Sequence, residues 1–552
     1  SILSLYLSAF HFFVVTLQQQ SNNNTKYYEM KKIYLIGLGV AMALSAQAGG
    51  LLTNTNQNVA FNRMMSREAS IGIDGVYSNP AGVAFLADGA HLSINFQSAF
   101  QTRTIRNEYA PFAYNTNNPT NEREFKGKAT APIIPSVQFA YNIKNWSLQA
   151  NLALTGGGGK CEFDNGLGSF ERIVANTALG VSQLAAGIDA ASQQMAPLGI
   201  HDPGLSQVFK SPAYSYNSFM RGKQYFWGLS LAGAYKFNDN LAVAAGVRGV
   251  LAIANYYGYV KDITVSGVPL SMMVDKTKPN SANIELNCDQ NGKGFTPYIG
   301  IDFKTGRFNF AAKYEFKTRL RMKNKSVNLA PSIGNLPEVL AVDYGVELLN
   351  PKLAEKYAGT PYESVVANAQ QALKGKMEAF GQTFDKGLKE AIGEYEDGTK
   401  VANDIPAYLA LGAGMKATDK LTVNVGFHYF FDKQATGYNN HNKLLKRGTI
   451  EYNAGVEYDA NKLLTLSAGW QSTNYGTTDA YMDDKSFVVS SNSIGMGACI
   501  HASKMIDVNV AYFTTIYGHK KMSQIDANTN MEYKSDFTRT NNALGVGVDI
   551  HF

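Results

Sequence analysis

Few residues of this chain have the types and spacing of a catalytic centre. The sequence contains no GxSxG, HExxH or phosphate-binding GxxxxGK[ST] motif, and the GGGGK run at 156–160 lacks the spacing of a phosphate-binding loop. The three cysteines include no CxxC pair, and the histidines are scattered along the chain. We therefore expect no enzyme, no cofactor and no metal site.

Carboxylate binding is the chemistry that the charged residues do allow. A guanidinium or ammonium group is the natural partner of a carboxylate. Four cations lie in segments of alternating polarity, on the polar side: Arg248, Lys313, Lys317 and Arg319. Acids such as Glu315, Glu451 and Glu457 share this polar side. The cations are therefore either ligand-binding candidates or members of ion pairs that line water.

Strands must position these residues, because apolar and polar side chains alternate over segments of about ten residues. In the last segment, Leu544, Val546, Val548, Ile550 and Phe552 alternate with small and polar residues. The same pattern predicts fourteen strands: 90–101, 132–143, 146–155, 224–237, 240–254, 294–304, 307–320, 405–416, 420–432, 448–459, 462–473, 491–502, 506–517 and 541–552. Connections between them alternate between very short turns and long loops, the longest at 156–223 and 321–404.

Amphipathic strands in even number, with short turns at one end and long loops at the other, are typical of an outer-membrane barrel. We predict an all-β transmembrane antiparallel up-and-down barrel over residues 90–552, closed because lipid offers no partner to backbone groups. A secreted β-sandwich would explain the alternation but not the regular sequence of connections. The terminal Phe552 is a residue type that outer-membrane assembly machinery commonly reads, which makes that machinery an expected partner.

The N-terminal region indicates export. Residues 30–48 form a signal peptide, with Lys31 and Lys32 before an apolar run and a small-x-small site at 46–48. We expect residues 1–29 to be upstream non-native translation, the alternative being a membrane anchor formed by their apolar first part. The predicted location is the outer membrane of a Gram-negative bacterium, in contact with outer-membrane lipid.

Composition agrees with this location. Charged residues make up 17% of the chain, below the roughly 25% of a soluble domain, and aromatic residues reach 12%, as interfacial girdles require. The formal net charge of +6 is small for 552 residues and forms no basic face, so we expect no nucleic-acid partner. No run of eighteen apolar residues follows the signal peptide.

Residues 49–89 lack the alternation and are predicted to form an N-terminal plug inside the barrel. They contain Asn79, Pro80, Ala81 and Gly82, preceded by Ser70-Ile71-Gly72. This plug resembles the hatch of the FadL family, the outer-membrane transporters of long-chain fatty acids and other hydrophobic compounds, in which an NPA motif occurs. Shorter similarities follow in order: Gly294-Phe295-Thr296-Pro297, Tyr314, Ile405-Pro406, Leu411-Gly412 and Gly495-Met496-Gly497.

The resemblance implies passive uptake of a hydrophobic small molecule, most simply a long-chain fatty acid, by a monomer. Loops would capture the ligand, the lumen would bind it, and an inward kink in the third strand would release it sideways. Gly156, Gly157, Gly158 and Gly159 follow the predicted third strand and are lateral-opening candidates, the alternative being a flexible loop entry. A plugged porin-like channel for other solutes and a surface adhesin or receptor are the alternative functions.

Two long loops carry helical periodicity and could form the capture groove. The candidates are Leu184, Ile188, Met377, Phe380 and Phe384, and the alternative is that each stripe packs on its neighbours. Cys161 and Cys288 are both expected near the long loops, where a disulfide is permitted and free thiols are the alternative. Cys499 is expected to face inward alone.

Overall fold

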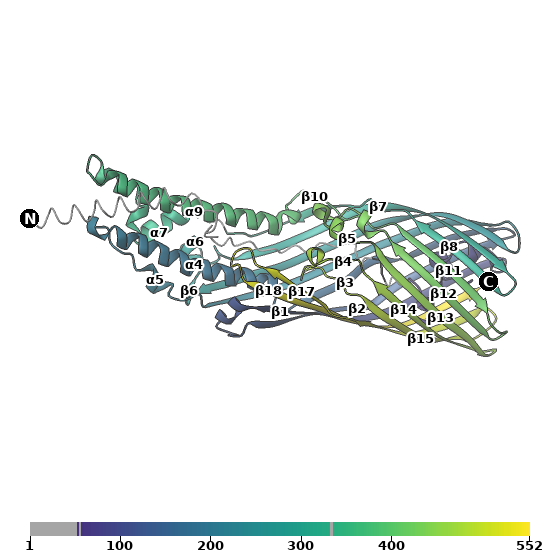
Figure 1. Cartoon of the computed structure of the whole chain (residues 1–552). Helices are drawn as coiled ribbons and strands as arrows, with labels where there is room; N and C mark the ends of the chain where they lie inside the picture. The colour runs from purple at the N-terminus through teal and green to yellow at the C-terminus, as the bar shows by residue number, and fades with distance from the viewer. Residues whose placement is uncertain (1–51, 54–56, 332–334) are drawn as a thin grey trace, which may run out of the picture.

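The structure is a computed structural model that describes residues 52–53, 57–331 and 335–552, with the side chains of 158 and 379–392 excepted. The predicted upstream segment 1–29 and signal peptide 30–48 lie outside these residues. The described chain forms a long barrel with a helical head at one end (Figure 1).

Fourteen antiparallel strands close the barrel, and each contains or overlaps one of the predicted strands. Consecutive barrel strands pair around the wall, and the last strand pairs with the first from His91–His551 to Tyr109–Tyr533. The prediction of a fourteen-stranded up-and-down barrel is therefore confirmed. The strands are β1 (Gly89–Tyr109), β2 (Glu122–Ile143), β3 (Trp146–Phe163), β4 (Tyr214–Lys236), β5 (Leu241–Val265), β7 (Ile284–Thr305), β8 (Phe308–Glu315), β11 (Tyr408–Lys416), β12 (Leu421–Phe430), β13 (Thr449–Asn461), β14 (Leu464–Asn474), β15 (Ser491–His501), β16 (Ile506–Tyr517) and β18 (Glu532–His551).

Several strands run further toward the head than the alternation predicted. β3 continues through the glycine run to Phe163 and β4 begins at Tyr214, so the predicted loop 156–223 is strand at both ends. Polar and apolar residues alternate only where one face of a strand meets an apolar environment and the other a polar one. Beyond that region the alternation is lost, although the strands remain hydrogen-bonded to each other. Four short strands also extend the wall: β6 (Val268–Pro269), β9 (Arg321–Ser326), β10 (Lys400–Ala402) and β17 (Lys520–Ile525).

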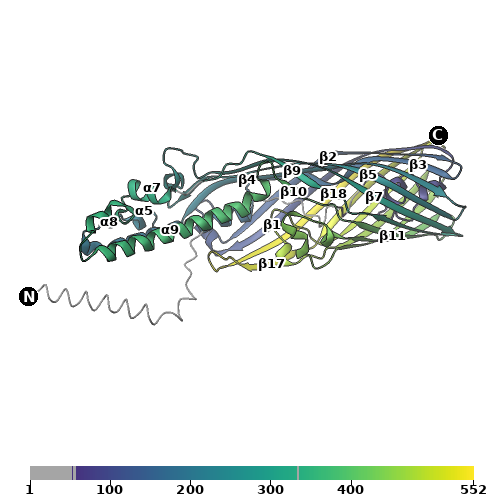
Figure 2. The ribbon, with the colours of Figure 1, turned by 90° about the horizontal axis from the view of Figure 1, so that it is seen from above.

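The head consists of helices from the long connections (Figures 1 and 2). It contains α4 (Gly168–Gln194), α5 (Leu205–Val208), α6 (Ser271–Val274), α7 (Leu336–Asp343), α8 (Lys352–Tyr357) and α9 (Glu363–Ile392). Their apolar side chains form one buried core with the ends of the strands that lie next to the head. The 3-10 turns are η1 (Gly82–Phe85), η2 (Ala110–Tyr114), η3 (Ala196–Leu198), η4 (Glu347–Leu349), η5 (Gly393–Tyr395), η6 (Asp432–Gln434), η7 (Tyr438–Leu444) and η8 (Asp479–Tyr481).

An apolar belt surrounds the barrel on the side of the short turns. Its members are large apolar side chains that the wall leaves exposed, among them Phe96, Leu148, Leu231, Ile299, Phe310, Val425, Leu466, Met496 and Val546. A continuous exposed belt of this kind on a closed barrel is what contact with lipid requires. No helix in the described part of the chain is both long and apolar enough to cross a membrane.

The lumen below the head is filled by residues 57–88, which carry α2 (Val59–Arg63), α3 (Gly75–Ser78) and η1. Most of these residues are buried. Val59 packs against the inner face of β18 so closely that a Cβ added at Gly545 would lie 2.9 Å from its side chain. Residues 57–88 of the segment predicted as a plug thus occupy the barrel interior.

A charge in the apolar belt should destabilise the barrel. Val546 is 52% exposed on the outer face of β18, so Val546→Arg forces a guanidinium into hydrocarbon and should lower the free energy of unfolding by about 2–4 kcal/mol. Urea unfolding in phospholipid vesicles measures this change. Val342→Arg, at an exposed position of the head, is the control and should change stability by less than about 0.5 kcal/mol; equal effects would contradict a lipid-facing belt.

Candidate functional site

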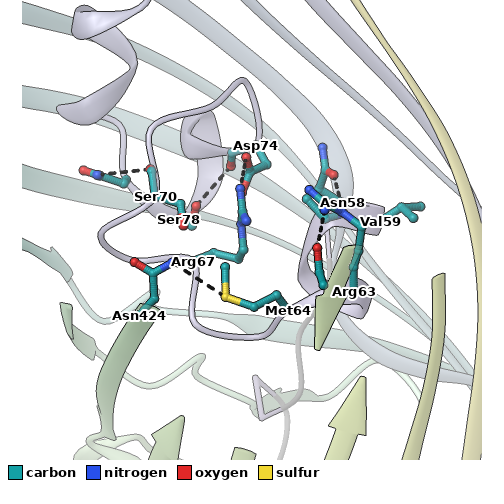
Figure 3. Close-up of polar contacts among 12 residues, drawn as sticks. Asn58, Val59, Arg63, Met64, Arg67, Ser70, Asp74, Ser78 and Asn424 are labelled. Carbon is teal, nitrogen blue, oxygen red and sulfur yellow. Dashed lines mark hydrogen bonds and ion pairs between the residues drawn. The ribbon is translucent and has the colours of Figure 1, made fainter. Parts of the chain in front are cut away.

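The first helix of the plug is fixed to the wall by amide side chains. Asn58 (Figure 3) caps α2 by accepting a hydrogen bond from the Ala60 amide at 2.8 Å. Its own amide donates to Ser93 (3.1 Å) and Gln138 (2.5 Å) of the wall. Asn62 donates to Gln97 at 2.9 Å. All these groups are buried, where an unpaired amide would be costly, so the contacts define one seating of the plug.

The predicted plug motif lies against the wall near the short turns. Asn79 donates to the buried carboxylate of Asp302 on β7, and its carbonyl oxygen accepts from the Gly82 amide at 3.1 Å. Gln149 of β3 donates to the Pro80 carbonyl at 2.7 Å, and Ala81 is fully buried. A Cβ at Gly82 would lie 2.4 Å from the Asn79 amide, so only glycine fits there.

A second set of contacts pairs plug cations with acids. The Arg67 guanidinium binds Asp74 of the plug at 2.7 Å (Figure 3) and also lies 3.4 Å from Glu457 of β13, which that figure does not label. Arg63 forms an ion pair with the same Glu457 at 3.0 Å. Burial opposes the charge of Arg67, but the neighbouring carboxylates outweigh it and raise the pKa of the guanidinium.

Two of the four predicted lumen cations meet at one carboxylate. Arg248 of β5 and Lys313 of β8 both form ion pairs with Glu315, the lysine at 2.7 Å. Lys313 also lies over the Tyr77 ring of the plug, 4.1 Å from its centroid. All three charged residues are buried. This triad holds two positive charges and one negative charge.

An acidic triad that sequence reasoning missed lies close by. His428 of β12 contacts Glu451 of β13 at 2.9 Å and Glu68 of the plug through its other nitrogen. All three residues are buried. Glu68 carried no signal because the plug has no periodicity. A small cavity of about 30 Å³, enough for a water molecule, adjoins His428, Glu68 and Tyr77.

The other two predicted cations do not reach this site. Lys317 is half-buried and lies 3.6 Å from Asp404, and Arg319 is exposed between the buried Thr318 and Leu320. The expectation that Arg319 points into the lumen is therefore wrong. β8 ends at Glu315, and Thr318 takes the inward position by bonding Thr296, which shifts the alternation.

The four glycines lie inside β3, at an interruption of the barrel wall. β2 and β3 pair up to Thr130–Lys160 and again from Val137–Leu152, while residues 131–136 and 153–159 between these points are unpaired with each other. Gly157 and Gly159 have φ angles of 94° and 69°, which other residues rarely adopt. Pro132 and Pro135 on β2 cannot donate backbone hydrogen bonds. The gap is thus encoded on both strands.

An apolar groove lies on the outer face beside this gap. It has a volume of about 660 Å³, and its walls include Phe96, Pro132, Ile133, Met496 and Leu544. Ile133 is 69% exposed. Pro132 and Ile133 lie in the unpaired stretch of β2, and the other lining residues come from β1, β15, β16 and β18. The groove therefore borders the gap on the lipid-facing side, and no residue of β3 lines it.

The capture-groove candidates have a different setting from the one predicted. Leu184, Ile188 and Met377 are buried in the core of the head, so they pack on their neighbours and do not line an open groove. The structure does not describe the side chains of Phe380 and Phe384.

The head also contains a buried carboxyl group. Burial raises the pKa of Glu394 to about 7; the positive charge of Lys485 opposes this rise and the negative charge of Asp483 adds to it.

The cysteines are free. Cys161 on β3 and Cys288 on β7 are both buried free thiols and form no disulfide with each other. Cys499 is also a buried free thiol, on β15.

Comparison with solved structures identifies the fold. A Pseudomonas aeruginosa FadL homologue superposes with a TM-score of 0.56 and 13% identity, covering 91% of this chain and all of the other. The chain has the fold of a FadL homologue. The P. putida toluene transporter TodX (TM-score 0.48, 12% identity, 87% and 94% covered) and the Ralstonia pickettii toluene transporter TbuX (0.43, 13%, 94% and 99%) are more distant. No protein-family model and no curated protein sequence matches the chain.

Removing the Asn79 side chain should loosen the plug. Asn79→Ala removes one amide donor from the buried Asp302 carboxylate, leaves the Asn309 amide in place at 2.9 Å, and should cost about 1–3 kcal/mol of local stability. Hydrogen exchange of residues 75–88 should accelerate accordingly. Asn240→Ala, which removes an exposed amide bonded to the Lys304 carbonyl, is the matched control; unchanged plug exchange in Asn79→Ala would show that the contact does not hold the plug.

Proposed function

We propose that this protein is an outer-membrane transporter for the passive uptake of hydrophobic compounds, with lateral release through the gap between β2 and β3. The observation that carries the proposal is that interruption, since it lies between a polar, plugged lumen and an apolar groove on the lipid-facing side. An apolar solute gains free energy by leaving a polar lumen for hydrocarbon. A sideways exit therefore needs no energy source.

The proposed location is the outer membrane of a Gram-negative bacterium. Support comes from the lipid-facing belt, the even number of strands and the signal peptide predicted at 30–48. Outer-membrane assembly machinery and lipid are the corresponding partners. A monomer is sufficient, because the closed barrel contains its own plug and its own gap.

The substrate class follows from the charges beside the plug. A buried triad with two cations and one carboxylate, formed by Arg248, Lys313 and Glu315, favours a further carboxylate, as a long-chain fatty acid would supply. Neutral hydrophobic compounds are the second candidate, because the neighbouring triad of His428, Glu68 and Glu451 has the opposite excess of charge. In that case the net charges of the two triads cancel, and no charged ligand is needed.

The alternative functions fit less well. A porin-like channel for hydrophilic solutes needs an open lumen, whereas here plug side chains are buried against the wall at several levels along the barrel axis. A surface adhesin or receptor would use the head and would need neither the gap nor the groove beside it. Catalysis has no motif in its favour, so we propose a transporter without enzymatic activity.

Uptake measurements test the proposed function. Cells that lack their own uptake route and express this chain should take up a labelled long-chain fatty acid or a neutral aromatic compound faster than cells with an empty vector. Liposomes that contain the protein should not swell in sugars, because the plug blocks hydrophilic passage. Swelling without hydrophobic uptake would support a porin, and surface binding without either would support an adhesin.

Closing the gap should reduce uptake. Pro132→Ala with Pro135→Ala restores two backbone donors on the strand that borders the gap, which allows β2 and β3 to pair more completely. We expect uptake of the hydrophobic compound to fall several-fold, with unchanged folding in detergent. Pro203→Ala in the head controls for proline removal as such. Full uptake in the double variant would rule out release through this gap.

A further inference from the structure

Three potential metal ligands gather on the lumen wall at the short-turn end of the barrel. Cys499 and His501 lie two residues apart on β15, and Asp507 on β16 is the direct partner of His501 in the ladder. One ligand atom from each residue lies within 4.8 Å of the others. The sequence predicted no metal site because the ligands come from two strands and from no recognised motif.

The hydrogen bonds around His501 fix which of its nitrogens carries a proton. The Thr465 hydroxyl donates to Asp459 at 2.6 Å, so its oxygen can only accept from the His501 Nε2, 3.0 Å away. In the neutral imidazole this leaves Nδ1 as a lone pair. That nitrogen lies 2.8 Å from the Asp507 carboxylate, which is also an acceptor.

The same reasoning applies to His551 on β18. The Ala87 carbonyl must accept from the His91 Nε2 (2.8 Å), so the His91 Nδ1 accepts from the His551 Nδ1 (2.8 Å). The neutral His551 then has its lone pair on Nε2, which lies 3.6 Å from the other oxygen of Asp507. Outer partners of this kind orient the histidine ligands of metal sites.

The Asp507 carboxylate therefore faces two imidazole lone pairs beside a cysteine thiol. Such a set of acceptors requires positive charge between its members, either as protons on the two histidines or as a metal ion. We propose that Cys499, His501 and Asp507, with His551 as the fourth donor, bind a divalent ion of the zinc class. One thiolate, two imidazoles and one carboxylate are donors that Zn²⁺ takes in tetrahedral sites.

The geometry and the surroundings suit this ion. Ligand atoms around Zn²⁺ lie about 2.0–2.3 Å from it and hence about 3–4 Å from one another, so small side-chain rotations suffice for Cys499, His501 and Asp507. His551 stands outside this group of three and would have to turn toward the ion from its place 3.6 Å from Asp507. Arg63 of the plug approaches β15, since a Cβ at Gly497 would lie 3.1 Å from its Cγ, but Glu457 pairs with it. The ion would join β15 and β16 to β18 next to the junction of the last and first strands.

This site is independent of the compound that the barrel carries, and metal binding alone tests it. The full chain in detergent, freed of metal with a chelator, should bind one Zn²⁺ per molecule. Co²⁺ in its place should give the intense visible absorption of a tetrahedral site and a thiolate charge-transfer band near the ultraviolet. Cys499→Ser should remove that band, and His501→Ala or Asp507→Asn should weaken Zn²⁺ binding at least tenfold.

His519→Ala is the matched control, because His519 also pairs with a carboxylate, that of Asp536 at 3.0 Å, but lies at the other end of the barrel. It should bind Zn²⁺ as the unaltered chain does. Heat-dependent gel mobility confirms that each variant is a folded barrel. The proposal would be overturned if the unaltered chain bound no stoichiometric Zn²⁺ or gave a Co²⁺ spectrum without thiolate absorption. It would also be overturned if Cys499→Ser and His501→Ala bound Zn²⁺ as tightly as the unaltered chain does. Protonated histidines would then supply the positive charge at this place.

Discussion

The hydrogen-bond ladder of the wall is the constraint on which the rest of this structure depends. In hydrocarbon a backbone group has no partner except another strand, so every strand in the belt must be paired on both sides. The chain meets this requirement around the circle, including the junction of β18 with β1. An interruption within such a wall is therefore costly and persists only where the local sequence favours it. Between β2 and β3 prolines remove donors and glycines permit the unusual backbone angles, so the interruption is specified by the residues that form it.

The closed ladder also determines what can fill the interior. The plug backbone comes so close to the wall that some inward positions have no room for a side chain. A Cβ at Gly495 would lie 2.2 Å from the Asn62 carbonyl oxygen, and one at Gly469 would lie 2.8 Å from the Met65 nitrogen. Amide and charged side chains around these positions supply the partners that the irregular plug backbone cannot find in a ladder. Part of the glycine content of the chain is thus a consequence of the plug.

Sequence periodicity predicted the fourteen strands because lipid and lumen impose opposite demands on alternate residues. Where that contrast ends, the prediction ends as well: the upper part of β3 was read as loop, and Arg319 was placed on the wrong face. The cationic pair at Glu315 could be foreseen in part, since Arg248 and Lys313 lie on regular strands. The contact of Glu68 with His428 spans 360 residues and joins an aperiodic segment to a strand, so no local pattern could reveal it. The helical stripes in the head were correctly recognised as amphipathic, but amphipathicity alone does not say whether the apolar side meets a ligand or a protein core.

The distribution of ion pairs bears on how a ligand could pass this plug. Arg67 pairs with Asp74 inside the plug, whereas three ion pairs join plug to wall: Glu68–His428, Arg63–Glu457 and Arg67–Glu457. Displacing the whole plug would separate these wall pairs, and the separation of a buried pair costs several kcal/mol because it leaves an uncompensated charge. A small shift near the β2–β3 gap would leave those pairs in place, since they lie on β12 and β13, far along the ladder from β3. Local movement beside an intact plug is therefore the less costly route, and for an apolar solute it ends at the groove on the lipid-facing side.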